Sequence, residues 1–125
     1  MFDGGFEMMI DGWLESRKIW LHQEAVDFRK QLDGLSLLVS SELEMDASDG
    51  TIYIFRNRSK DKIKLLVWER NGFFLGYKRL ERGRFSFPVN ESGQVEISKA
   101  ELGMLISGMP MTWLGGESRK KVSHF

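Results

Sequence analysis

Cysteine is absent from this chain of 125 residues. That absence excludes a disulfide framework and any zinc site built on thiolates, and it fits a reducing compartment. Histidine is scarce as well, since only His22 and His124 occur. Two isolated histidines without cysteine do not make a zinc site. We therefore predict that the protein has no metal site and no cofactor.

Long apolar runs are also missing. The uninterrupted apolar stretches fall far short of the roughly 20 residues that cross a bilayer. The first 16 residues hold no lysine or arginine and four acidic residues, which is the opposite of a signal peptide's basic start. We expect a soluble, cytoplasmic protein that does not bind membranes.

The known catalytic motifs are also absent from the sequence. The chain contains no nucleophile elbow, no metalloprotease helix and no phosphate-binding loop. Its aspartates fit structural roles: Asp27 as a helix cap, Asp46 and Asp49 in turns, Asp33 on a helix surface and Asp61 in a basic loop. Metal-dependent strand transfer needs an acidic cluster, and none is apparent. We predict that the protein is not an enzyme and has no catalytic residues.

The charges that are present are unevenly distributed. Residues 56–84 hold ten basic and three acidic residues, a net charge of +7, while the rest of the chain holds eight basic and 15 acidic residues, a net charge of −7. Such a block indicates a surface that faces a polyanion. Solvated lysines and arginines on an ordinary sheet are the alternative, and composition does not separate the two.

Apolar periodicity predicts two main helices. The first is expected from residue 28 to about 44, with Asp27 as its N-cap and a close packing contact at Gly34. The second follows a capping box, Ser98-Lys99-Ala100-Glu101, with Gly108 near its end. Its apolar stripe comprises Leu102, Leu105, Ile106 and Met109.

Alternating patterns predict strands at residues 18–22, 51–57, 62–70 and 73–80. Shorter strands are expected at 84–87, stopped by Pro88, and at 96–97. The order β-α-β-β-β-α indicates an α+β fold, a small, mostly antiparallel sheet with two main helices packed on one face. We expect one domain at 18–113, an N-terminal extension at 1–17 that includes a short helix or a loosely packed segment, and a flexible polar tail at 114–125.

The turn Asn71-Gly72 sets the expected register of the central hairpin. A two-residue loop there pairs Trp68 with Leu75 and Leu66 with Tyr77. One face of the hairpin is then almost wholly apolar and should lie under both helices. That face consists of Ile63, Leu65, Val67, Phe74 and Leu80.

The other face of the hairpin mixes aromatic residues with cations. Such a surface suits stacked bases and phosphates, with Trp68 and Tyr77 as candidate stacking residues. The alternative is that Trp68, Leu66 and Tyr77 form a second core layer under the N-terminal segment. The candidate nucleic-acid-binding residues are Arg56, Arg58, Lys62, Lys64, Lys78, Arg79, Arg82 and Arg84.

Four motifs, in order over about residues 18–113, resemble one known family. Asp27-Phe28-Arg29-Lys30 with Asp33-Gly34-Leu35 is similar to the family's D-M-R-K-x-x-D-G-L, with phenylalanine in place of methionine. The other three are Ile52–Arg58 with Asp61–Trp68, Asn71–Phe73 with Tyr77–Phe85, and the helix Ser98–Met109 followed by Trp113. The chain resembles the TnpB accessory proteins of the IS-sixty-six class of insertion sequences, which are unrelated to the RNA-guided nuclease of that name.

The resemblance implies an accessory role in DNA transposition beside a separate transposase that carries the catalytic residues. We expect the chain to bind DNA and to help assemble the complex with that transposase. The alternative is a protein–protein adaptor whose basic face docks an acidic surface of the transposase without touching DNA. The resemblance assigns no individual role to the matching residues, which include Arg29, Lys30 and Asp33.

Overall fold

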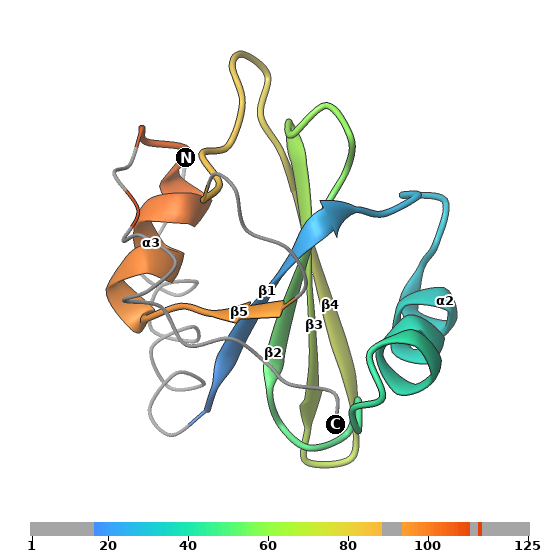
Figure 1. Cartoon of the computed structure of the whole chain (residues 1–125). Helices are drawn as coiled ribbons and strands as arrows, with labels where there is room; N and C mark the ends of the chain where they lie inside the picture. The colour runs from blue at the N-terminus through green and yellow to red at the C-terminus, as the bar shows by residue number, and fades with distance from the viewer. Residues whose placement is uncertain (1–16, 89–93, 111–112, 114–125) are drawn as a thin grey trace.

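A computed structural model describes residues 17–88, 94–110 and 113 (Figure 1). The predicted α+β class is confirmed. The predicted N-terminal helix and the polar tail lie outside the described residues. The elements, in chain order, are β1 (Ile19–Ala25), α2 (Leu32–Leu37), the π-helical turn η1 (Leu38–Glu42), β2 (Ile52–Arg56), β3 (Lys62–Glu69), β4 (Gly72–Arg79), β5 (Gln94–Glu96) and α3 (Lys99–Ser107).

The five strands form one sheet in the order β4-β3-β2-β1-β5. Neighbouring strands are antiparallel except β1 and β2, which are parallel and are connected through α2 and η1. Within the described residues, no helix is long and apolar enough to span a membrane.

The two helices cover opposite faces of the sheet, not one face as predicted (Figure 1). The reason is that β3 is apolar on both sides, as a strand buried between two layers must be. Helix α3 covers the face of Ile63, Leu65 and Val67, together with Phe85 and Phe87. Helix α2 and η1 cover the face of Leu66, together with Trp20, Tyr53 and Phe55.

This arrangement corrects the predicted packing of the first helix. Leu35 and Leu38 are buried as expected, but they pack with Leu66 on the face that the sequence predicts to mix aromatic residues with cations. The alternative of a second core layer is right for Leu66, although α2 and η1, rather than the N-terminal segment, pack against it in the described residues.

The hairpin register differs from the prediction by two residues. The loop is Arg70-Asn71, with Arg70 at φ +63°, and Gly72 already belongs to β4. Large apolar side chains thereby face one another directly, with Val67 opposite Phe74, Leu66 opposite Leu75 and Trp68 opposite Phe73. Because the slip is an even number of residues, every side chain keeps its predicted face.

The first helix starts at Leu32 and not at residue 28. Asp27 does not cap it, because its carboxylate accepts a hydrogen bond from the Arg29 N–H (2.9 Å) in a local turn. Such turns compete with helix formation. The Lys64 ammonium completes the loop by donating to the carbonyl oxygens of Phe28 (3.0 Å) and Lys30 (2.7 Å). The predicted close contact at Gly34 is present, because a Cβ there would lie 3.1 Å from the Lys30 Cβ.

The predicted capping box of the second helix is confirmed. The Ser98 hydroxyl accepts from the Glu101 N–H, and the Glu101 carboxylate accepts from the Ser98 N–H. The residues of the strand expected at 84–87 are instead irregular and belong to none of the strands of the sheet. Its phenylalanines, Phe85 and Phe87, are buried under α3. The strand expected at 96–97 is β5, at 94–96.

Candidate nucleic-acid interface

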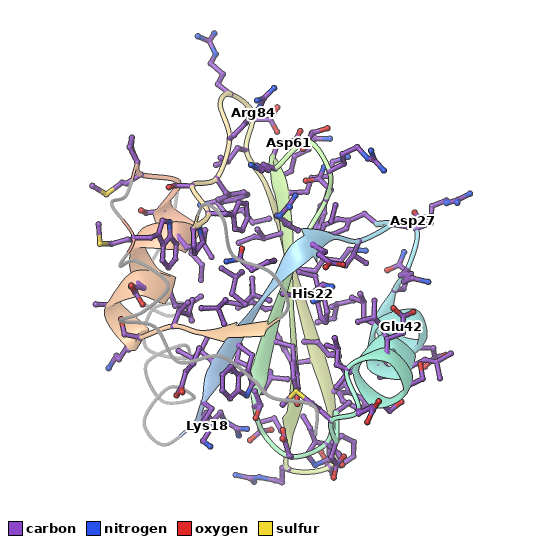
Figure 2. All side chains as sticks on the ribbon, in the orientation of Figure 1. Lys18, His22, Asp27, Glu42, Asp61 and Arg84 are labelled. Carbon is purple, nitrogen blue, oxygen red and sulfur yellow. The ribbon has the colours of Figure 1, made fainter. Side chains whose placement is uncertain are left out.

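Three loops gather at one end of the sheet. Strands β1, β2 and β4 finish there and β3 begins there, because β1 and β2 run parallel while β3 is antiparallel to β2 and β4. The loops are residues 26–31, 57–61 and 80–84, and Figure 2 shows Arg84 and Asp61 at that end, with Asp27 to one side. We call residues 57–62 and 79–84 the basic end.

Backbone hydrogen bonds tie loops 57–61 and 80–84 together. The Leu80 N–H donates to the Asp61 carbonyl oxygen (2.8 Å), and the Phe85 N–H donates to that of Lys60 (2.7 Å). Lys60 and Gly83 adopt left-handed conformations, with φ of +65° and +79°. The two loops therefore hold their side chains on a shared backbone frame.

Asp61 has a structural role within this frame. Its carboxylate accepts a hydrogen bond of 2.6 Å from the Asn57 amide, whose oxygen accepts from the Lys62 N–H (3.0 Å). The Asn57 hydrogen bond holds the pKa of Asp61 below its usual range. Asp61 therefore braces the loop as a carboxylate. Within the described residues, no three acidic or histidine side chains are grouped to hold a metal ion.

Five of the six cations of the basic end are exposed, and the sixth, Lys62, is half-buried. The structure shows no hydrogen bond or ion pair from Arg58, Arg82 or Arg84 to another side chain among the described residues. Arg79 is paired with Glu81 at 3.1 Å on the surface, and this carboxylate raises the pKa of Arg79. The basic end carries six basic and two acidic residues, a net charge of +4. It is a surface able to contact several phosphates at once.

Three predicted binding residues make hydrogen bonds within the fold. Lys64 is buried, and its ammonium lies 4.8 Å from the Phe28 ring centroid, so it is not part of an exposed cationic surface as predicted. Arg56 donates to the carbonyl oxygens of Gln23 and Asn57, and burial lowers its pKa. Lys78 lies on the α3 face, where it donates to the Ile106 carbonyl oxygen (2.6 Å).

The two candidate stacking residues lie apart. Trp68 is half-buried near the hairpin turn, far along β3 from the basic end, and meets Phe73 edge-on at 5.0 Å. Tyr77 is 55% exposed and lies on the same face as Arg79, two residues away. Only Tyr77 is placed to accompany the exposed cations.

Sequence reasoning missed three cations near this end, Arg29, Lys30 and Lys60. Arg29 and Lys30 were expected on a helix but lie in loop 26–31, where Arg29 is paired with Asp27 at 2.6 Å. The hydrogen bonds from Arg29 lower the pKa of Asp27 to about 2. The turn-forming Asp27, two residues before Arg29, was the signal that could have revealed a loop.

The chain is similar to a known sequence family and to other proteins. The sequence family described as "IS66 Orf2 like protein" matches residues 17–114. Two relatives from Sinorhizobium fredii carry the names "Uncharacterized protein y4jC" and "Uncharacterized protein y4hO". The first is 35% identical over 95 residues, 76% of this chain and 81% of the relative. The second is 36% identical over 92 residues, 74% of this chain and 80% of the relative. No solved structure matches the chain.

Proposed function

Because the chain belongs to the family of IS66 Orf2-like proteins, we propose that it binds DNA through its basic end and helps to assemble the transposition complex of a separate transposase. An accessory role in an insertion sequence follows from the family. Catalysis is assigned to the transposase and not to this chain.

The proposed DNA contact is supported by the exposure of Arg58, Arg82 and Arg84 on two loops that backbone hydrogen bonds tie together. Their guanidinium groups are not neutralised by any described carboxylate, so they attract an external anion. Side chains on loops suit phosphate contacts, which position a protein on a duplex without reading its sequence. We therefore expect the basic end to bind duplexes of different sequence with similar affinity.

Replacing Arg82 and Arg84 together by alanine should weaken the salt dependence of DNA binding. Affinity should fall by about 0.9 log units per phosphate contact for each tenfold rise in salt. The double variant should lose about two contacts from that slope, roughly equally for any sequence. Titration of labelled duplex at several salt concentrations, with wild type and variant side by side, measures the difference.

The matched control is the double variant Lys18→Ala/Arg70→Asn, which removes two exposed cations from the opposite end of the sheet. Figure 2 shows Lys18 at that end, far from Arg84. Asparagine suits position 70, where φ is +63°. The control should keep the wild-type slope. An equal loss in both variants would mean that total charge, and not the basic end, governs binding. A wild type that binds no duplex at low salt would end the DNA proposal.

A second candidate function, an adaptor that docks the transposase without touching DNA, is favoured by the surface of α2. Residues 31–51 contain five acidic residues and no lysine or arginine. Leu37 is 63% exposed there and lines an open cleft of about 420 Å³ with Asp33, Asp46 and Phe73. This cleft suits a basic partner segment that carries an apolar side chain.

Co-purification with the transposase separates the two candidates. An adaptor should retain the transposase in excess duplex DNA and lose it in Leu37→Ser. A DNA-dependent association should instead disappear after nuclease treatment and survive Leu37→Ser.

A further inference from the structure

Strand β4 is an open edge of the sheet. It is eight residues long, whereas β5 at the other edge has three. None of the described residues pairs with its outer side, where every second residue presents an N–H and a C=O group. It lacks the usual protections of an edge along Gly72–Tyr77, because that stretch contains no proline and no charge. Its pairing with β3 also runs without a bulge.

The side chains and backbone of this edge are accessible. Tyr77 is 55% exposed, and Phe73 and Leu75 are half-buried on the same face. A Cβ at Gly72 would meet nothing within 4 Å. Glycine within a strand often marks the close approach of another backbone, and β4 has a second one, Gly76. The sheet face that α2 covers therefore continues to the outer side of β4, where a further strand could pair.

We propose that a second copy of this chain pairs with β4 in the antiparallel direction, centred on Leu75. A two-fold axis there places Leu75 against Leu75 of the second copy and Phe73 against its Tyr77. Aromatic and aliphatic cross-strand pairs of this kind stabilise sheets. Lys78 falls opposite Gly72 of the second copy, and Arg79 opposite its Asn71, so no like charges face each other directly. This self-complementarity favours a second copy over an unrelated strand.

The antiparallel arrangement has a consequence that rests on the proposed function. The two basic ends lie at opposite ends of the paired strands, and eight residues at about 3.3 Å each separate them by roughly 26 Å. That exceeds the Debye length of about 8 Å at physiological salt, so their mutual repulsion is screened. Each end is then free to hold its own duplex, and the dimer joins two DNA segments.

Cysteine cross-linking tests the pairing, because the native chain has no cysteine. Full-length Leu75→Cys should form a disulfide-linked dimer on mild oxidation. Phe73→Cys and Tyr77→Cys should cross-link mainly when mixed with each other. Met104→Cys, at an exposed position on α3, should stay monomeric. Cross-linking of Leu75→Cys no faster than that of Met104→Cys, with a monomeric wild type in sedimentation at tens of micromolar, would overturn the proposal.

A bridging assay separates this inference from the proposed function. Wild type should retain a labelled duplex on beads that carry a second, immobilised duplex. Leu75→Glu, which sets two carboxylates against each other at the two-fold axis, should sediment as a monomer and lose bridging while its single-duplex salt slope is unchanged. A monomeric Leu75→Glu that still bridges would refute the β4 dimer as the bridge. Absence of any duplex binding, beside intact Leu75→Cys cross-linking, would refute the DNA proposal alone.

Discussion

Leu35→Ala should lower the free energy of unfolding by about 2–5 kcal/mol, the usual range for a buried leucine truncated to alanine. Leu35 has no exposed surface and packs in the cluster formed by Trp20, Tyr53 and Leu66. Helix α2 has six residues, too few to be stable alone. Its position on the sheet therefore depends on this buried side chain and its neighbours.

Leu37→Ala is the matched control for that experiment. Leu37 lies two residues away on the same helix but is 63% exposed, so its truncation should change stability by no more than about 0.5 kcal/mol. Urea denaturation of the wild type and both variants measures the difference. Equal losses, or an unchanged midpoint for Leu35→Ala, would contradict the placement of α2 on the Leu66 face.

The sequence predicted which side chains share a face more reliably than it predicted what covers that face. The period of two in β3 assigns Leu65 and Leu66 to opposite sides whatever the hairpin register. The loop proved to be Arg70-Asn71, but the even slip left that assignment intact. Choosing a face for each helix was harder, since Leu66, Tyr53 and Phe55 make the second face as apolar as the first. Strand pairings remote in sequence produce that second face.

The sequence likewise predicted some features of the candidate site and not others. The closely spaced Arg82-Gly83-Arg84 predicted exposed cations that the structure places on a loop. The burial of Lys64 could not be predicted from its own strand. Its hydrogen-bond partners, the Phe28 and Lys30 carbonyls, lie 36 and 34 residues away in sequence. A helix beginning at residue 28 would have used those carbonyls internally. The error in the helix start and the error at Lys64 thus have one cause.

Lys64→Met should lower the free energy of unfolding by about 1–3 kcal/mol, because it leaves two backbone carbonyls without their donor. Methionine retains the apolar stem but contributes no ammonium for the hydrogen bonds or for the Phe28 ring. Thermal or urea unfolding measures the loss.

Lys62→Met is the comparison that decides the role of Lys64. Lys62 lies on the same face of β3, two residues before Lys64, and belongs to the basic end. It is only half-buried, and its side chain forms no hydrogen bond shown among the described residues. Its replacement should leave stability within about 0.5 kcal/mol of wild type, as at other surface positions. It should also flatten the salt slope of DNA binding by about one contact. If Lys64→Met instead kept full stability and flattened the slope, Lys64 would contact phosphate, and loop 26–31 would have to open to expose it.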